Sequence, residues 1–558
     1  MKRFLPLVLA GAALASAPLA AQTAPGEGPR KHAPRPTRAA ITAEDLKTRV
    51  YGFTDDSMRG RAAGTRDNVR GAELIARELR RLGLRPAGEK GTFFQDVPLI
   101  RRTLSPSAHV TAGGTRFVAW KDFFPRDQGL QTRDIDNAEV VYGGTWADTA
   151  SLIAREAAAG KLVVLTLGRD SAGQPVQPNR NNITNRFVGA AGIAVVSVEE
   201  SSPDELALYR TPGLALPPTP GGAARPAYLY VNRPLAAALL GAPVESARPG
   251  ATGPRVRGSL LFTNVPASAR NVIAVLPGSN PALRGQYVAV GSHNDHLPPS
   301  TRSFDHDSLR VFNRFVRPEG ADSPAGEANA EQAAGIRAAL DSLRRIRPAR
   351  RDSVYNGADD DGSGSMAMLE IAEALARAPK RPERSTLFVW HTAEEVGLLG
   401  AQWYTDHPTV PLDSIVANLN IDMLGRGGPL DGRAPGYLQL IGSRRLSTEL
   451  GDIVDATNLA QRTPFTIDYS YDADGHPDNS YCRSDHYMYA RYGVPVTFFS
   501  TGGHRDYHQV TDEAQYLNYE HFARATQLIH DVLVRVANLD HRVVVDKPKP
   551  DPNVPCRQ

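Results

Sequence analysis

The sequence has few of the features that mark disulfide-rich, membrane-embedded or nucleic-acid-binding proteins. Its 558 residues include two cysteines, Cys482 and Cys556, which can form at most one disulfide. Beyond the N-terminus no apolar run is long enough to span a bilayer. The formal net charge is only +4, and no basic stripe with interleaved aromatics is present, so no nucleic-acid partner is expected. The remaining composition, 41% hydrophobic and 22% charged, is that of a globular protein of two to four domains.

The N-terminus has the pattern of a secretory signal peptide over residues 1–21. Lys2 and Arg3 precede an apolar run, and small residues precede Gln22. A membrane anchor is the alternative, but the run is short and interrupted by proline. The signal predicts export to the periplasm or the extracellular space. There the two cysteines can pair, although two unpaired thiols remain equally open.

The rest of the chain divides into regions of different pattern. Residues 22–40 are a flexible Pro-rich leader, and residues 541–558 are a Pro-rich tail. Helical periodicity begins at residue 41, and residues 41–130 are expected to be the N-terminal part of a main domain. Residues 131–265 contain short buried strands and form a separate module. This module resembles the protease-associated domain inserted in several exopeptidases, which implies an α+β fold.

Residues 268–540 alternate hydrophobic strands with helices, which predicts an α/β domain with a mostly parallel mixed sheet flanked by helices. A polar insertion over residues 298–356 interrupts this domain, and we expect it to form part of the rim or lid of a site. The carboxyl ends of parallel strands share one edge of a sheet, where ligands bind. Histidine, aspartate or glutamate follows each of four predicted strands in this domain: His293, Glu394 with Glu395, Asp422, and, after a loop, His508.

Three consecutive aspartates, Asp359 to Asp361, precede a predicted helix that begins with Gly-Ser-Gly. Alone, such a run is compatible with a calcium loop or an exposed turn, although it lacks the carboxylate spacing of an EF-hand. Two imidazoles and three carboxylates are expected to converge, which is more than one four-coordinate zinc needs: His293, Asp360, Glu395, Asp422 and His508. Two zinc ions sharing a bridging carboxylate would use all five and would offset the repulsion among the aspartates.

The motifs HNDH at 293–296, GADDDGSG at 357–364, TAEEVGLLGAQ at 392–402, NIDMLG at 420–425, and RSDH with DYHQVTDE at 483–513 resemble the co-catalytic zinc exopeptidases of the bacterial leucyl aminopeptidase and aminopeptidase Y type. The resemblance implies the phosphorylase/hydrolase-like fold of these peptidases and two Zn²⁺ per chain. It assigns His293 and Asp422 to one zinc, Glu395 and His508 to the other, and Asp360 to the bridge. It also implies that Glu394 is the general base and that Asp295 orients His293.

The resemblance implies a secreted aminopeptidase that hydrolyses N-terminal residues from peptides with a free N-terminus, using a zinc-bound water activated by Glu394. Tyr507 is a candidate donor to the oxyanion, with a packing role as the alternative. A carboxypeptidase or dipeptidase on the same centre remains open. A glutaminyl-cyclase-like enzyme or an inactive receptor fits the complete ligand set less well. We do not expect His296, His504 or Asp512 to bind metal, and adjacent Ser484, Asp485 and His486 cannot form a catalytic triad.

Overall fold

The computed structural model describes residues 27–558, except residues 127, 129–131, 133, 134, 172, 174, 177–182, 184, 185, 218–224, 325, 428–433, 435, 553 and 555. The predicted signal peptide and the first residues of the leader lie outside this part of the chain. None of the described helices is long and apolar enough to cross a membrane.

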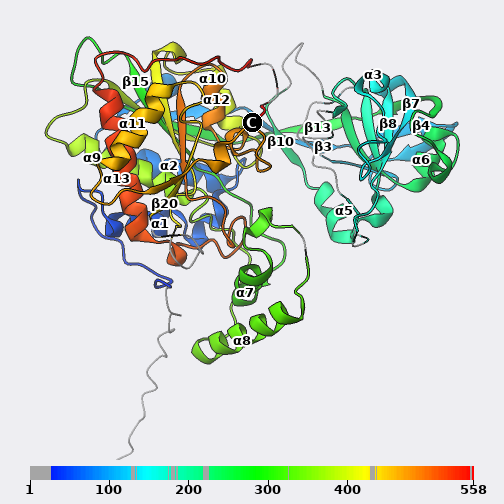
Figure 1. The fold of residues 1–558 in the computed structure, drawn as a ribbon, viewed down its shortest axis with the longest axis horizontal. Coiled ribbons are helices and arrows are strands. Elements are labelled where there is room, and N and C mark those ends of the chain that lie inside the picture. Colours follow the sequence, from blue (N-terminus) through cyan, green and yellow to red (C-terminus); the bar gives the residue numbers. More distant parts are fainter. Residues whose placement is uncertain are drawn as a thin grey trace, which may run out of the picture.

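A mixed sheet of nine strands forms the centre of the larger body, counted over the described residues (Figure 1). Its central strands are parallel: β18 (Ser385–His391), β15 (Tyr287–His293), β19 (Ile415–Ile421) and β22 (Val496–Ser500). Antiparallel neighbours flank them, β14 (Arg270–Leu276) on one side and β20 (Tyr437–Ile441) on the other. The outer strands are β1 (Arg85–Pro86), β2 (Phe94–Asp96) and β21 (Thr466–Asp468). The predicted α/β class with a mostly parallel mixed sheet is confirmed.

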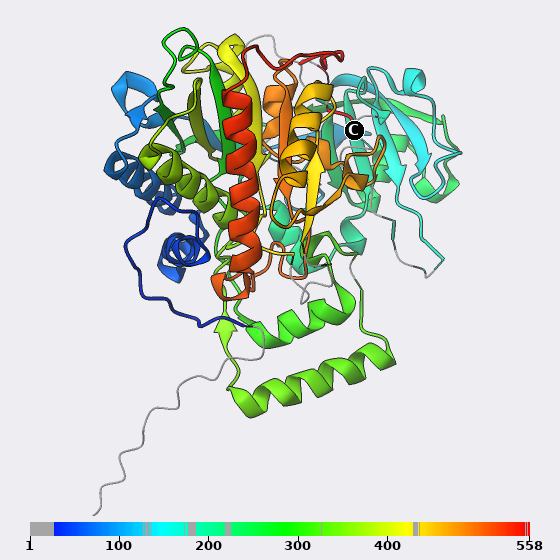
Figure 2. The same cartoon turned by 60° about the vertical axis from the view of Figure 1, so that its left-hand side comes forward.

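Helices cover both faces of this sheet, which is why its strands are continuous apolar runs. Alternate residues of one strand enter different cores: Val272 and Ala274 of β14 face one side, and Ile273 and Val275 face the other. On the first side lie α1 (Ala43–Phe53), α2 (Arg66–Arg81), α9 (Gly362–Arg377), α11 (Thr448–Leu459) and α13 (Tyr519–Ala537), of which α13 is the long red helix of Figure 2. On the second side lie α10 (Leu399–Asp406) and α12 (His486–Ala490).

A second sheet of eight strands, in the described residues, forms the separate module. In sheet order its strands are β5 (Thr115–Val118), β4 (His109–Ala112), β12 (Thr252–Ser259), β7 (Ile135–Thr145), β8 (Leu162–Thr166), β9 (Gly192–Val196), β11 (Ala227–Val231) and β6 (Phe123–Pro125). Helices α3 (Arg155–Ala158), α5 (Pro203–Tyr209) and α6 (Arg233–Leu240) accompany it. The predicted boundary at residue 131 was too late, because β4, β5 and β6 pair within this sheet. Its identity as a protease-associated domain stays a prediction.

A small antiparallel sheet joins the module to the body (Figure 1). In it β3 (Leu99–Leu104) pairs with β13 (Phe262–Ala267) on one side and with β10 (Gly213–Ala215) on the other. The two chain segments that enter and leave the module therefore run side by side as a ribbon.

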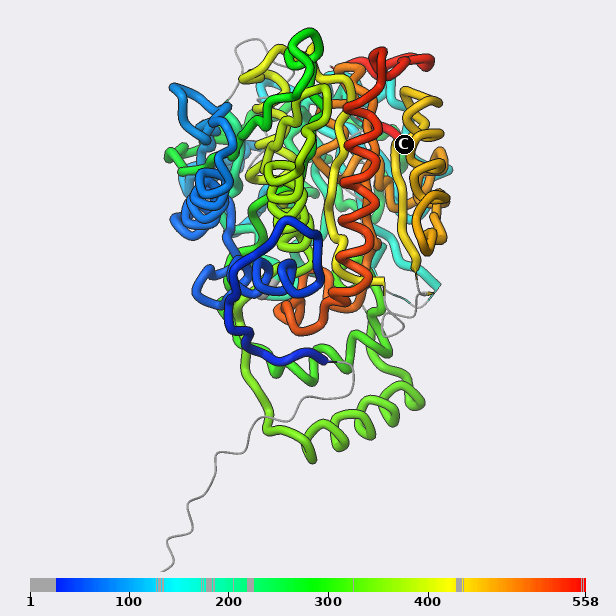
Figure 3. The backbone as a smooth tube through the Cα atoms, turned by 90° about the vertical axis from the view of Figure 1, so that its left-hand side faces the viewer, coloured from blue at the N-terminus to red at the C-terminus, as the bar shows by residue number. Residues whose placement is uncertain are grey.

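The polar insertion forms a pair of helices, α7 (His306–Val316) and α8 (Ala330–Ile346), between the short strands β16 (Phe304–Asp305) and β17 (Arg351–Asp352). The pair lies below the body in Figures 1 and 2. The leader holds it, because Arg347 donates to the Glu27 carboxylate with an N···O distance of 2.6 Å. Figure 3 shows this leader in dark blue, passing above the insertion toward α1. At the other end of the chain a disulfide joins Cys556 of the tail to Cys482.

Candidate metal centre

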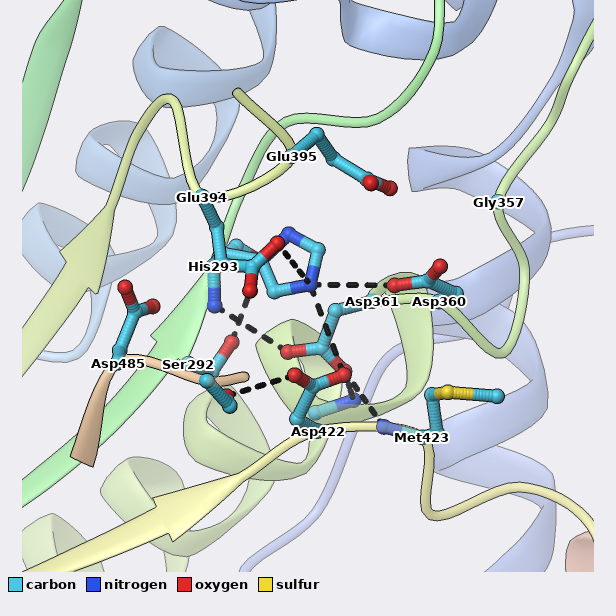
Figure 4. A network of polar contacts seen from close by, with 12 residues as sticks. Ser292, His293, Gly357, Asp360, Asp361, Glu394, Glu395, Asp422, Met423 and Asp485 are labelled. Atoms are coloured by element: carbon cyan, nitrogen blue, oxygen red, sulfur yellow. Dashed lines mark hydrogen bonds and ion pairs between the residues drawn. The ribbon is translucent and has the colours of Figure 1, made fainter. Parts of the chain in front are cut away.

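Of the residues predicted from the strand ends, Figure 4 shows His293, Glu394, Glu395 and Asp422 lying together at the carboxyl edge of the large sheet. His293 is the last residue of β15, and Asp422 directly follows β19. Glu394 and Glu395 follow β18, which pairs with β15 in parallel so that His293 is opposite His391. Asp360 approaches from the loop before α9, and His508 from the loop after β22. Parallel strand order therefore gathers residues that are far apart in the sequence.

The three consecutive aspartates have three different roles. Asp361 caps α9, since its Oδ1 accepts a hydrogen bond from the N–H of Gly364 at 2.8 Å, and its Oδ2 accepts the N–H of His293. Asp359 accepts the N–H of Gly425 at 2.6 Å and lies 3.1 Å from Nε2 of His504. Asp360 alone turns toward the centre of the site. Helix capping and loop anchoring thus account for two of the three charges.

Two groups of possible metal ligands share the carboxylate of Asp360. Its Oδ1 lies 3.1 Å from Nε2 of His293, which is also 3.5 Å from Oδ1 of Asp422. Its Oδ2 lies 3.0 Å from Nε2 of His508, which is also 2.9 Å from Oε2 of Glu395. Asp360 therefore stands between a His293–Asp422 group and a His508–Glu395 group, as a bridging ligand would.

These donors fit divalent metal ions. Nε2 of His293, Nε2 of His508 and Oδ2 of Asp360 are buried atoms that form no hydrogen bond with any described residue. Among the described residues, no arginine or lysine forms an ion pair with the carboxylates around them. An ionised carboxylate is costly to bury unless a cation or hydrogen bonds compensate its charge. Imidazole nitrogen and carboxylate oxygen are donors that zinc prefers.

Glu394 lies beside the His293–Asp422 group, with its Oε2 4.0 Å from Nε2 of His293. Burial raises the pKa of Glu394 well above its ordinary value, and the Asp422 carboxylate adds to this although His293 opposes it. A bound cation would act in the opposite direction by favouring the ionised carboxylate. Glu394 thus lies at the edge of the ligand set. The proton affinity of its carboxyl group depends on the neighbouring charges, as a general base requires.

A cavity of about 160 Å³ opens onto both groups. Tyr507 lines it, with its ring stacked 4.0 Å from that of His508 and its hydroxyl 3.2 Å from the Arg483 guanidinium, which donates to it. Burial raises the pKa of Tyr507 well above its ordinary value, so its hydroxyl keeps the proton that it can donate. Glu319 and Asp322, from the loop after α7, line the same cavity. This agrees with the prediction that the insertion contributes to the rim.

One supporting contact differs from expectation, and another was not expected. The carboxylate of Asp295 is 3.8 Å from Nδ1 of His293, whereas its main-chain oxygen is 3.0 Å away and makes the direct contact. The Asp295 carboxylate instead accepts the N–H of Glu394 at 3.1 Å. Ser484, excluded as a triad member, donates to Oδ2 of Asp422 at 2.7 Å.

Sequence reasoning missed two residues of the site. Asp512 accepts the N–H groups of both Asp359 and Asp360, at 2.9 and 3.1 Å, and so holds the aspartate loop. His296, which we did not expect to bind metal, belongs to the second donor group, with its Nδ1 2.5 Å from Oε1 of Glu395. The HNDH motif contains this histidine, but the course of the chain after β15 could not be predicted from the sequence.

The region around this site is similar to known proteins. Residues 271–533 match the sequence model of peptidase family M28. Leupeptin-inactivating enzyme 1 of Streptomyces exfoliatus is 30% identical over 198 residues, which are 35% of this chain and 37% of that protein. Leucine aminopeptidase 1 of Penicillium rubens is 30% identical over 182 residues, which are 31% of this chain and 45% of that protein. The chain thus spans less than half the length of these curated relatives.

Among solved structures, an aminopeptidase from Aneurinibacillus sp. strain AM-1 aligns with a TM-score of 0.47 at 16% identity, over 91% of this chain and 97% of that one. A zinc aminopeptidase from Bacillus subtilis aligns with a TM-score of 0.44 at 15% identity, over 89% and 96%. Both donor groups and Glu394 fall within the residues that the family model covers. The match to peptidase family M28 therefore spans the whole candidate metal centre.

Proposed function

We propose that this protein is an exported dizinc aminopeptidase that removes N-terminal residues from peptides. The observation that carries the proposal is the position of Asp360, whose two oxygens face two different donor groups. Relatives named leucine aminopeptidase and a solved zinc aminopeptidase support the same activity and metal. Two metal ions about 3.5–4 Å apart form a centre suited to hydrolysis of an amide bond.

In this proposal the first ion is held by His293, Asp422 and Asp360, and the second by His508, Glu395 and Asp360. Zinc bound there would lower the pKa of a water ligand to about 7 and polarise the scissile carbonyl. Glu394 takes a proton from the attacking water and delivers it to the leaving nitrogen as the C–N bond breaks. Tyr507, held by Arg483, donates a hydrogen bond to the oxygen on which negative charge develops.

The charge of the cavity favours a free amino terminus over a carboxyl terminus. Four acidic side chains outside the donor groups line it, Glu319, Asp322, Glu394 and Asp478. Arg483 is the only cationic side chain among the described residues that line it, and Asp322 neutralises it across 2.8 Å. An ammonium group therefore meets an attractive field here and a carboxylate a repulsive one. The small volume, below the roughly 300–1,000 Å³ of pockets for drug-sized ligands, suits a single terminal residue.

Export to the periplasm or the extracellular space is part of the proposal. It rests on the signal-peptide pattern of residues 1–21, and the disulfide between Cys482 and Cys556 supports an oxidising destination.

The deciding experiment measures the metal content of the purified protein and its hydrolysis of three substrates. These are leucine p-nitroanilide, the N-acetylated form of this compound, and an N-blocked peptide with a free C-terminus. We expect two zinc ions per chain and cleavage of the free-amine substrate alone. Cleavage of only the N-blocked peptide would replace the proposal with a carboxypeptidase. Less than one zinc per chain, not restored by added metal, would contradict the metal centre itself.

A further inference from the structure

His296 occupies a position in the site that the proposed catalytic assignments do not use. The described donor atoms form one set of three residues, His293, Asp360 and Asp422, and one set of four. The fourth member of the larger set, beside Asp360, Glu395 and His508, is His296. We infer that His296 is a fourth protein ligand of the second metal ion, an inference that rests on the proposed dizinc centre.

The distances among the four donors support a shared ion. Nδ1 of His296 lies 2.5 Å from Oε1 of Glu395 and 3.7 Å from Oδ2 of Asp360. Nε2 of His508 lies 3.0 and 2.9 Å from oxygens of the same two carboxylates. Ligands about 2.0–2.2 Å from a tetrahedral zinc are about 3.3–3.6 Å apart. Three of the four N···O distances are shorter than this, so the two imidazoles face the same pair of carboxylates and would move apart by about 1 Å or less around a shared ion.

The surroundings of His296 fix its ring in this position. Its side chain is fully buried, and its ring lies edge-on to that of His508 with 5.5 Å between centroids. Gly357 makes room for it, because a Cβ at this residue would stand 2.5 Å from Cγ of His296. Gly357 also has a φ of +55°, which a side chain would disfavour. The loop that carries Asp360 therefore passes directly over the ring of His296.

With His296 as a ligand, the two metal positions differ in their number of protein ligands. A zinc ion with four protein ligands is closed, whereas one with three keeps a position open for water or substrate. Glu394 lies beside the group of three donors, 4.0 Å from Nε2 of His293. The ion at His293 is then the exchangeable one next to the base, and the ion at His296 is held more tightly and acts chiefly through its charge.

The test counts metal-bound histidines in the cobalt-loaded full-length protein. A histidine bound to Co²⁺ gives a strongly shifted, exchangeable ring N–H signal in the proton NMR spectrum. We expect three such signals at two cobalt ions per chain, from His293, His296 and His508. Two signals in the wild-type protein would overturn the inference and leave His296 as a hydrogen-bond donor to Glu395. This count needs no variant and does not depend on activity.

A conservative substitution separates the two roles of the ring. In His296→Asn the amide N–H₂ can still donate to Glu395, but the side chain is a poor zinc ligand. We expect the loss of one shifted signal and a weakening of one metal site by more than about 100-fold, beyond the 10–100-fold typical of a lost supporting hydrogen bond. Wild-type affinity at both sites would contradict ligation by His296.

The matched control is His521→Gln, which alters a buried histidine on α13 whose Nε2 bonds to the main-chain oxygen of Tyr437, outside both groups. It should leave signal count and affinity unchanged. The test of His296 as a ligand gives a result that is distinct from the test of the proposed function. Three signals without cleavage of any substrate would refute the aminopeptidase but keep His296 as a ligand. Cleavage of the free-amine substrate with only two signals would support the aminopeptidase and refute ligation by His296.

Discussion

The two large sheets of this protein have the same plan, but the candidate metal centre lies at only one of them. In the body the parallel strands β18, β15, β19 and β22 lie side by side, and in the module β7, β8, β9 and β11 do the same. In both, apolar strands are covered by cores on their two faces. Architecture therefore does not distinguish them, and the difference must lie in the side chains that follow the strands.

In the module, acidic side chains beyond the strand ends meet arginines. Glu200, after β9, lies 3.4 Å from the guanidinium of Arg169 and 3.8 Å from that of Arg233, at the surface. In the body, Asp360 and Asp422 are buried and meet imidazoles and other carboxylates. An acid paired with arginine needs no further cation, whereas carboxylates buried among imidazoles and other carboxylates are costly to keep ionised without one. We infer that the lack of an arginine or lysine counter-charge, more than the fold, distinguishes the candidate metal centre.

The largest expected effect comes from Glu394→Gln in the body. Glutamine keeps the shape of the side chain but cannot accept the proton of water, so kcat should fall by about 10²–10⁴-fold. The zinc content should stay that of the wild type, because Glu394 is in neither donor group. Turnover of leucine p-nitroanilide and metal analysis on the same sample check both expectations.

The control for this variant is Glu200→Gln, the corresponding change beyond a strand end of the module. It weakens two ion pairs near the surface, with Arg169 and Arg233, and should leave kcat and zinc content unchanged. Full activity in Glu394→Gln would refute the assignment of the base. Loss of activity in Glu200→Gln would refute the contrast between the two sheets.

The sequence predicted the part of this contrast that depends on local pattern. Apolar runs in the sequence predicted β15, β18, β19 and β22. Because parallel strands end at a common edge, the sequence also predicted that His293, Glu395 and Asp422 lie close together. The module boundary was wrong because β6 pairs with β11 and β4 with β12, and such distant pairing leaves no local signal. His296 and Asp512 were missed for a related reason, since their contacts depend on how loops cross over one another.

The next effect concerns the disulfide, which lies in the body and has no counterpart in the module. The bond joins residues 74 positions apart, so it restricts the unfolded chain strongly. Replacing Cys482 and Cys556 together by alanine should lower the free energy of unfolding of the body by about 2–4 kcal/mol. Amide hydrogen exchange should quicken in β20 and β22 and stay unchanged in β8 and β9. Equal quickening in both sheets would mean that they unfold as one unit.

A smaller effect is expected from Asp512→Asn, which tests how the aspartate loop is held. One oxygen of Asp512 accepts two loop N–H groups, and the other accepts from Arg426 at 3.2 Å. The amide N–H₂ of asparagine would face one of these donors and displace Asp360. Zinc affinity should fall by about 10–100-fold, as measured by competition with a chelator.

Asp506→Asn is the matched control for this variant. Asp506 is equally buried and also pairs with Arg426, at 3.1 Å, but it is bonded to the neighbouring Thr511 instead of to the loop. This variant should lose stability while it keeps the wild-type zinc affinity. Equal loss of affinity in both variants would show that general destabilisation, and not the hold on Asp360, governs metal binding.

The smallest expected effect is that of Arg233→Ala in the module. Arg233 pairs with Glu245 at 2.5 Å, and the two side chains are 50% and 63% exposed. Water screens such a pair, so the free energy of unfolding of the module should fall by less than about 1 kcal/mol, with zinc content and kcat unchanged. Urea denaturation followed by hydrogen exchange in β9 and β11 measures the first quantity. A larger loss, or any change in metal binding, would mean that charges beyond the module's strands also support the site, and the contrast between the two sheets would fail.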